Sequence, residues 1–378
     1  MASKLRIFTK RVLVLINYGV VFVFLLACLA PYLDPQSWWF ISFLGMLFPF
    51  LLLAVAGFFA WWLFVKRKYA WISAIALLLG IKSISVFYAF NFPRGFKKEK
   101  DPNSIRIATW NVARFIEMKK NNNKGSQTLK KMLAEIKQVN ADIICLQEFF
   151  HSYDSAFYQN LDYIRDSLKY PYHYYSHDID GDKHFTGNAI FSRFPIIDSG
   201  LIRYPRPTLP EALMHADIRL RNRIIRVSPT HLQSLQLGKT DYERIERIKG
   251  GDEGLVSNSK TIFSKVKKGV VNRKIQTDII KQVLGDSPYP VIFCGDLNDI
   301  PNSYTYFKIR GEMQDAFLKK GFGIGRTFSA ISPTLRIDFI FADRRFRINQ
   351  FRRIAKNYSD HYMLVSDIEL KTMTKKSR

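Results

Sequence analysis

Residues 291–298 read VIFCGDLN, and this stretch indicates the fold class of most of the chain. Its apolar run predicts a buried strand, and Asp296 and Asn298 follow where that strand ends. Four more segments place a polar residue after or inside an apolar strand: IATWN ending at Asn111, IICLQE ending at Glu148, SPTH ending at His231, and RIDFIF with Asp338. A sixth, YSDH, contains Asp360 and His361. Because strand ends converge on one edge of a sandwich, we expect these side chains to form one site.

From about Ser104 onward, short strands alternate with helical and polar segments. Strands are expected at about 105–110, 142–147, 188–192, 212–219, 224–230, 291–294 and 336–342. Apolar residues at three- and four-residue spacing predict helices at 128–138 and 274–284, whereas 121–126 and 250–268 are typical of polar surface loops. Strands that alternate with helices but also pair in hairpins predict an α/β sandwich with mixed sheets.

The first hundred residues are mostly apolar. Three stretches, at about 12–30, 40–65 and 70–90, are each long enough for a hydrocarbon core of roughly 30 Å. The third is interrupted by Lys82 and is the weakest of the three as a span. A cleaved signal peptide is excluded because the first run is too long and two more follow it. We therefore expect about three transmembrane helices.

Basic residues that flank the apolar stretches predict their orientation. The amino-terminal tail carries four and the second loop carries Lys66, Arg67 and Lys68, while the first loop has none. This pattern places the tail and the second loop in the cytoplasm. Three spans would leave the large domain outside the cytoplasm, at the plasma (inner) membrane, and we favour this arrangement. The basic residues at 94–100 favour the opposite side, which would hold if the third stretch is only a half-membrane hairpin.

Charge and composition limit the classes of function. The 378 residues carry a formal net charge of +25, of which +15 lies after residue 100. A basic domain suits a polyanionic substrate or an anionic lipid surface, and charge alone does not separate the two. The aromatic fraction of 15% excludes a disordered chain, and three scattered cysteines exclude a disulfide framework.

Taken together and in this order, the six segments resemble the endonuclease/exonuclease/phosphatase superfamily over about residues 104–370. The resemblance implies a four-layer α/β sandwich with two central mixed β-sheets, here preceded by about three transmembrane helices. It also implies a divalent-metal-dependent phosphoesterase. The corresponding division of the chain is a membrane anchor at 1–100 and a catalytic domain at 101–378.

The resemblance assigns the metal site to three residues. Glu148 matches the metal-binding glutamate of the superfamily, Asn111 the asparagine beside it, and Asp360 a residue that reaches the metal in some members. Carboxylate and amide oxygens are the ligands that a hard Mg²⁺ or Mn²⁺ ion prefers. The implied cofactor is therefore Mg²⁺ or Mn²⁺.

The resemblance also assigns five catalytic roles. Asp296 matches the aspartate that orients or activates the attacking water, and Asn298 would donate to a phosphate oxygen. Asp338 matches the aspartate that pairs with His361, and such a pair fixes the tautomer of an imidazole directed at the phosphate. His231 matches a second histidine that could protonate the leaving oxygen or bind the phosphate.

Some alternatives stay open at this point. Ala113 stands where the apurinic endonuclease branch has an acidic residue, and that branch also lacks a histidine at the position of His231. Both differences favour the deoxyribonuclease I and sphingomyelinase-like branch. The expected partners are a lipid bilayer and a phosphate ester, either a phospholipid headgroup or a nucleic acid. A non-catalytic membrane-bound binding protein that retains the fold is the alternative. Taken singly, Asn111 also fits a turn and Asp338 an outward-facing strand residue.

Overall fold

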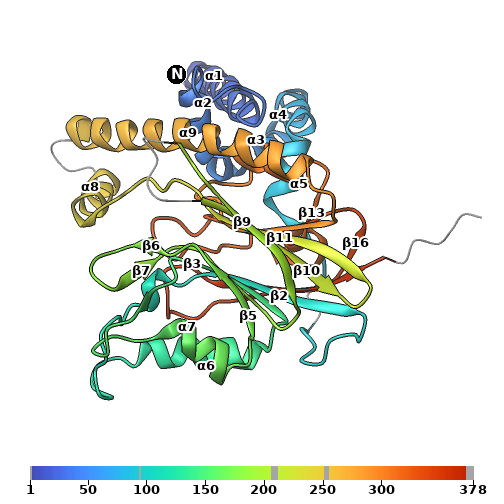
Figure 1. Ribbon diagram of the computed structural model, residues 1–378. Coiled ribbons are helices and arrows are strands. Elements are labelled where there is room, and N and C mark those ends of the chain that lie inside the picture. The colour runs from blue at the N-terminus through green and yellow to red at the C-terminus, as the bar shows by residue number, and fades with distance from the viewer. Residues whose placement is uncertain (1, 93–94, 206–211, 251–254, 372–378) are drawn as a thin grey trace, which may run out of the picture. The chain divides into compact units, whose positions relative to one another are not determined.

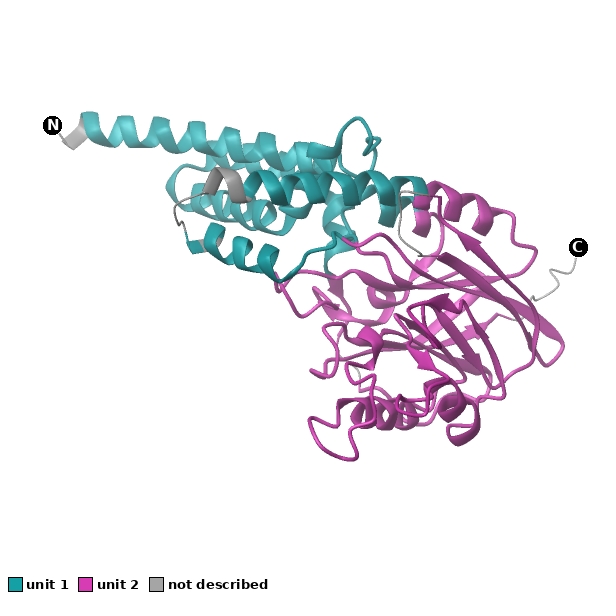
Figure 2. Cartoon of the chain, turned by 60° about the vertical axis from the view of Figure 1, so that its left-hand side comes forward, with its two compact units in different colours: residues 1–88, 235–275, 299–308 teal, residues 89–234, 276–298, 309–378 magenta. Residues whose placement is uncertain are grey.

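The computed structural model describes residues 2–92, 95–205, 212–250 and 255–371 (Figure 1). Contacts divide the chain into two compact units, which Figure 2 shows in separate colours. Unit 1 comprises residues 1–88, 235–275 and 299–308. Unit 2 comprises residues 89–234, 276–298 and 309–378, and it carries all six of the segments from which the site is predicted.

Two six-stranded sheets form the centre of unit 2. The first has the order β13–β15–β12–β11–β10–β9, with β9 (Ile196–Arg203), β10 (Ala212–Leu220), β11 (Arg223–His231), β12 (Val291–Asp296), β13 (Gln314–Asp315) and β15 (Asp338–Ala342). The second has the order β16–β17–β2–β3–β8–β5, with β2 (Ser104–Asn111), β3 (Ile143–Gln147), β5 (Tyr172–Tyr175), β8 (Ala189–Ser192), β16 (Phe346–Ile354) and β17 (Met363–Leu370). Each sheet is mixed, because β11 and β12 run parallel, as do β2 and β3, while the other pairs are antiparallel.

Two apolar cores hold these sheets in place. Ile107 and Cys145 of the second sheet pack with Ile292 and Ile340 of the first, so an apolar core fills the space between the sheets. A second core lies under the other face of the β2–β3 sheet, which α6 (Thr128–Val139) and the short α7 (Asn160–Asp162) cover in Figure 1. Helix α6 buries the apolar stripe that its sequence spacing predicts. The predicted α/β sandwich with two central mixed sheets is confirmed.

Smaller elements complete unit 2. A three-stranded sheet joins β4 (His151–Ser152), β7 (His184–Thr186) and β6 (Asp178–Ile179), and β1 (Ala89–Phe90) pairs with β14 (Phe322–Gly323). Helix α11 (Ala316–Lys320) begins at Asp315, whose side chain accepts hydrogen bonds from the amides of Phe317 and Leu318 and so caps the helix. A buried ion pair of 2.7 Å joins the same Asp315 to Arg336, two residues before Asp338.

Unit 1 is helical and contains the apolar part of the chain. Its elements are α1 (Ala2–Cys28), α2 (Trp39–Met46), α3 (Phe48–Val65), α4 (Arg67–Leu79), α5 (Ile81–Phe87), α8 (Lys239–Gly250), most of α9 (Leu255–Gly285) and the start of α10 (Tyr304–Arg310). Two helical stretches, Lys4–Cys28 and Phe48–Val65, are long and apolar enough to cross a membrane. A third crossing exists only if α4 and α5, bent by 65°, form one span.

The breaks in the apolar stretches have local causes. Pro49 has no amide hydrogen and its ring excludes the carbonyl of Gly45 from a continuous helix, so α2 ends at Met46 and α3 starts afresh. Gly80 separates α4 from α5, and a Cβ there would meet the Phe24 ring at 2.6 Å. The stretch expected at 40–65 is therefore two helices, of which only the second is long enough to span.

Unit 1 also takes in two segments from the later part of the sequence. The Phe43 and Phe263 rings lie 4.4 Å apart, and Asn302 donates a 3.0 Å hydrogen bond to the carbonyl of Ala27. Helix α9 begins at Leu255, so the surface loop expected at 250–268 is wrong for its described residues from 255 onward. The many polar residues of α9 are typical of a loop, but the helix has apolar positions at helical spacing, including the buried Val266 and Val270.

Candidate active site

Six of the predicted site residues stand at or next to the ends of strands, whereas Asp360 and His361 lie in the segment between β16 and β17. Asn111 is the last residue of β2, and the residue opposite it on β3 is Gln147, so Glu148 follows at the same edge. In the first sheet, His231 ends β11 opposite Asp296, which ends β12. Asp338 begins β15 and is paired with Asp296 in the antiparallel register. These registers bring the ends of five strands to one place, as the sequence predicts.

A pair of carboxylates converges on Asn111. Its amide nitrogen lies 3.1 Å from Glu148 Oε1 and 3.2 Å from Asp296 Oδ2, and its oxygen accepts a 3.1 Å hydrogen bond from the amide of Ala113. The Glu148 side chain is 39% exposed, whereas that of Asp296 is only 1% exposed. Glu148 also has a positive φ of 49°, a conformation that costs energy for a non-glycine residue and that concentrates at functional sites.

The turn after β12 fixes Asp296. Its Oδ1 accepts a 2.8 Å hydrogen bond from the backbone amide of Asn298, which itself has a φ of 49°. The amide nitrogen of the Asn298 side chain donates to the carbonyl of Leu232 at 2.9 Å and has a second hydrogen that can be donated. Gly295, with a φ of 125°, is required here because a Cβ would lie 2.1 Å from the carbonyl oxygen of Thr230.

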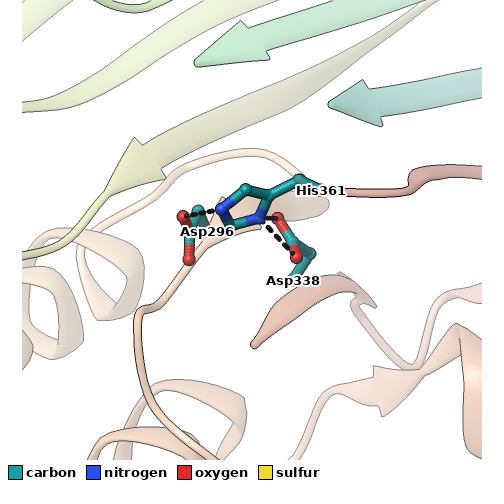
Figure 3. A group of neighbouring side chains, drawn as sticks. All are labelled: Asp296, Asp338 and His361. Carbon is teal, nitrogen blue, oxygen red and sulfur yellow. Dashed lines mark hydrogen bonds and ion pairs between the residues drawn. The ribbon is translucent and has the colours of Figure 1, made fainter. Parts of the chain in front are cut away.

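Asp338 and His361 form a buried pair (Figure 3). His361 Nδ1 lies 3.0 and 3.2 Å from the two carboxylate oxygens, and its Nε2 faces Asp296 Oδ2 at 3.6 Å. Burial lowers the pKa of His361, but the Asp338 and Asp296 carboxylates outweigh it and raise that pKa to about 10. Burial raises the pKa of Asp338 to about 6, against the opposing effect of His361. The two carboxylates therefore favour the protonated form of this imidazole.

His231 lies close to the carboxylates of Glu148 and Asp296, whereas the Asp360 side chain points to solvent. His231 Nε2 lies 3.6 Å from Asp296 Oδ2 and 3.9 Å from Glu148 Oε1, so it joins the cluster. The Asp360 side chain is exposed, and its Oδ1 accepts a hydrogen bond from Ser359 at 3.2 Å. Among the described residues, no hydrogen bond or ion pair connects the Asp360 carboxylate to Glu148 or Asn111.

Several supporting residues are not evident from the sequence motifs. Ser359 donates to the carbonyl of Asn111 at 2.9 Å and accepts from the amide of His361 at 3.1 Å, so it ties β2 to the histidine. Trp110 donates from its indole nitrogen to the carbonyl of His361 at 2.9 Å. Thr327 accepts from the amide of Asp338 at 3.1 Å. Ser359 and Trp110 lie inside quoted motifs, whereas nothing in the sequence around Thr327 indicates its role.

A left-handed turn follows Asn111 directly. Four consecutive residues, Ala113 to Ile116, have φ between 44° and 65°, which is rare for residues with a side chain. The amide of Arg114 donates to the carbonyl of Glu148 at 3.0 Å, and its guanidinium pairs with Asp180 at 2.9 Å. This turn places an arginine beside the backbone of Glu148, and no motif in the sequence predicts it.

The donor set fits a hard divalent cation. Two carboxylates, Glu148 and Asp296, approach one amide, and in the part of the chain that the structure describes neither forms an ion pair with a lysine or arginine. Oxygen-rich, acidic surroundings of this kind are typical of Mg²⁺ and Mn²⁺ sites. Ligand atoms of Asp296, Asp338 and His361 also lie within 4.8 Å of one another, which gives a second geometrically feasible metal set (Figure 3).

Comparisons with known proteins identify the family of the chain. The Endonuclease/Exonuclease/phosphatase family matches residues 108–361, and the chain belongs to that family. Residues 10–87 match a domain of unknown function (DUF8431). A search among curated proteins gave no match.

Solved structures match the chain, and the first of the three described here shares its fold. The endonuclease/exonuclease/phosphatase from Beutenbergia cavernae DSM 12333 matches with 20% identity and a TM-score of 0.52. The match covers 71% of this chain and 72% of that one. The human Nocturnin catalytic domain with bound sulfate anion matches with 18% identity, coverage of 71% and 94%, and a TM-score of 0.49. Humanized D. rerio TDP2 matches with 16% identity, coverage of 71% and 99%, and a TM-score of 0.48.

Proposed function

We propose that this protein is a membrane-anchored, divalent-metal-dependent phosphoesterase that hydrolyses a phosphodiester or a phosphomonoester. The observation that carries the proposal is the convergence of Glu148, Asn111 and Asp296 with the His361–Asp338 pair at the ends of five strands. Membership of the Endonuclease/Exonuclease/phosphatase family supports it. Residues 1–100 are proposed as the anchor and 101–378 as the catalytic domain.

Each residue has a role that follows from its surroundings. Glu148 and Asn111, with Asp360 if its exposed side chain turns inward, would hold Mg²⁺ or Mn²⁺. The bound ion would supply Lewis-acid polarisation of the phosphate. Asp296 has one oxygen fixed by the amide of Asn298, and its other oxygen can accept a proton from an attacking water.

The remaining groups stabilise charge on the phosphate. Asp338 holds His361 and favours its protonated form, so Nε2 of His361 can donate to a phosphate oxygen as negative charge develops. The second side-chain hydrogen of Asn298 can donate to the same group. His231, close to Asp296, is proposed to protonate the leaving oxygen or to bind the phosphate.

The proposed location is integral to the plasma (inner) membrane, with the catalytic domain on the non-cytoplasmic side. The basic residues that flank the apolar helices support it. The side depends on whether the bent α4–α5 pair forms one span, because two spans and three spans leave unit 2 on opposite sides of the membrane. Labelling of a Glu312→Cys variant in intact cells with a membrane-impermeant maleimide tests the side. The three native cysteines are buried, so the introduced thiol is the reporter.

A substrate panel tests the catalytic proposal. The full chain in detergent would be assayed with Mg²⁺ and with chelator on bis(p-nitrophenyl) phosphate, sphingomyelin, phosphoinositides and plasmid DNA. We expect metal-dependent hydrolysis of at least one ester, lost in Asp296→Ala and His361→Ala and retained in the surface variant Asp198→Ala. Metal binding without turnover on any ester would instead support a non-catalytic binding protein that retains the fold.

A further inference from the structure

Unit 2 contains a pocket that the proposed chemistry does not use. Its volume is about 880 Å³, within the range of small-molecule sites. Three parts of the chain line it: β1 with residues between it and Ser104, the end of α11, and strands β16 and β17. None of the eight proposed site residues lies on its wall.

Hydrogen bonds hold described residues on both sides of 93–94 in the segment that follows β1. Asn91 donates to the carbonyls of Leu318 and Gly321 at 2.9 and 2.8 Å. Gln350 accepts from the amide of Lys97 at 3.0 Å and donates to the carbonyl of the same residue at 3.1 Å. The buried Arg106 donates to the carbonyls of Lys97 and Lys98. These bonds form the wall without any ligand.

Among the described residues, the charged groups on the wall that form no ion pair are three lysines and two carboxylates, which leaves a net charge of +1. Of its cations, Lys100 pairs with Asp142 and Arg347 pairs with Glu369. Lys97, Lys319 and Lys320 are exposed, and within the described residues none of them has an ion-pair partner. The acidic groups on the wall are Glu99, Asp101 and Asp367, of which Asp367 is neutralised by Arg106.

Exposed aromatic rings accompany these lysines. Phe90, Phe92 and Phe322 are 76%, 90% and 54% exposed, and Phe90 is opposite Phe322 in the β1–β14 pair. Helix α5 ends at Phe87, so Phe92 is at most roughly 18 Å of extended chain from the last apolar helix. Aromatic rings beside basic residues at this distance from a membrane span are typical of the lipid interface.

We propose that this headgroup pocket, the pocket lined by Lys97, Lys319 and Lys320, binds the phosphate headgroup of an anionic phospholipid of the membrane that holds the anchor. The inference rests on the proposed membrane attachment. Positive charge alone would equally suit a nucleic acid. The exposed phenylalanines and the short connection to the apolar helices favour a lipid, whose acyl chains would lie where Phe90 and Phe92 are.

Native mass spectrometry of the full chain in detergent tests the pocket. The chain would be titrated with dioctanoyl phosphatidylglycerol, with dioctanoyl phosphatidylcholine as the neutral probe. Each interfacial lysine contributes roughly fivefold to anionic lipid affinity, so Lys319→Ala/Lys320→Ala should weaken phosphatidylglycerol binding about thirtyfold. The matched control is Lys130→Ala/Lys137→Ala on the exposed face of α6, which removes the same charge and should bind like the wild type.

The outcomes separate the pocket from the proposed function. Equal affinity for the two lipids, or an equal loss of phosphatidylglycerol affinity in both double variants, would overturn the pocket assignment. Binding of an oligonucleotide without binding of phosphatidylglycerol would overturn it as well. Hydrolysis of bis(p-nitrophenyl) phosphate by the pocket variant should stay within twofold of wild type, because the pocket contains no proposed catalytic residue. Release of the wild-type chain from membranes by alkaline carbonate would overturn the membrane attachment and the headgroup pocket with it.

Discussion

Replacement of Asp338 by asparagine separates two assignments for the cluster in Figure 3. The asparagine side chain would keep an oxygen that accepts from Nδ1 of His361 but would lose the negative charge. At an effective dielectric constant of about 20, a charge pair 3.0 Å apart interacts by roughly 5 kcal/mol before desolvation is subtracted. Hydrogen bonds to charged groups contribute about 1.5–3 kcal/mol net, which corresponds to roughly 10- to 150-fold in rate.

The assay is the initial rate of bis(p-nitrophenyl) phosphate hydrolysis at several Mg²⁺ concentrations. We expect the kcat of Asp338→Asn to fall within that range, because the imidazole loses the group that keeps it charged and oriented. The Mg²⁺ concentration for half-maximal activation should stay within twofold of wild type, since Asp338 is not among the proposed ligands Glu148, Asn111 and Asp360.

Two results would refute this reasoning. A kcat within twofold of wild type would show that the Asp338–His361 pair does not act on the reacting phosphate. A tenfold or larger rise in the Mg²⁺ requirement would place the ion in the alternative set of Asp296, Asp338 and His361, whose ligand atoms lie within 4.8 Å of one another.

Three further predictions concern stability. Asp315→Ala should lower the free energy of unfolding by about 3–5 kcal/mol, measured by urea unfolding in detergent, because it leaves the buried guanidinium of Arg336 without its partner; a loss under 1 kcal/mol would contradict this. Gly295→Ala should lower both the thermal midpoint and the turnover, since the new Cβ would meet the carbonyl oxygen of Thr230, and an unchanged variant would show that the turn after β12 is not constrained. His151 should make stability more sensitive to acid. Burial lowers the pKa of His151 below its usual 6.5, so this residue binds more protons in the unfolded chain than in the folded one, and its contribution to stability falls as the pH drops below about 6.5. The difference in thermal midpoint between wild type and His151→Gln, measured from pH 7.5 to 5, should therefore shift in favour of the variant as the pH falls, and a constant difference would contradict this.

Much of the catalytic fold could be predicted because each strand has a compact apolar signature and each motif stands at a strand end. The segment VIFCGDLN becomes β12, and its Asp296 contacts residues from three other motifs, Asn111, His231 and His361. The convergence of these residues could be predicted from the apolar strands and the polar residues at their ends, since strand ends meet at one edge of a sheet. The Asp338–His361 pair was expected from the resemblance and is observed with hydrogen-bond geometry.

Other features depend on tertiary packing and were out of reach. The left-handed turn at 113–116 has no glycine and is held by the carbonyl of Glu148, a contact between segments distant in sequence. The headgroup pocket arises from three segments that only the fold brings together. The break before Pro49 could have been read from the sequence, because proline excludes a continuous helix, whereas the one at Gly80 depends on packing against Phe24.

The most direct test of the central claim is the rate of bis(p-nitrophenyl) phosphate hydrolysis by the full chain as a function of Mg²⁺ concentration. We predict saturable activation that chelator abolishes. Glu148→Gln should raise the Mg²⁺ requirement at least about tenfold, because it removes a charged ligand, while the control Glu135→Gln on α6 should behave like the wild type. A rate that is independent of Mg²⁺ and of chelator, or that is unchanged in Glu148→Gln, would contradict a metal-dependent phosphoesterase centred on Glu148 and Asp296.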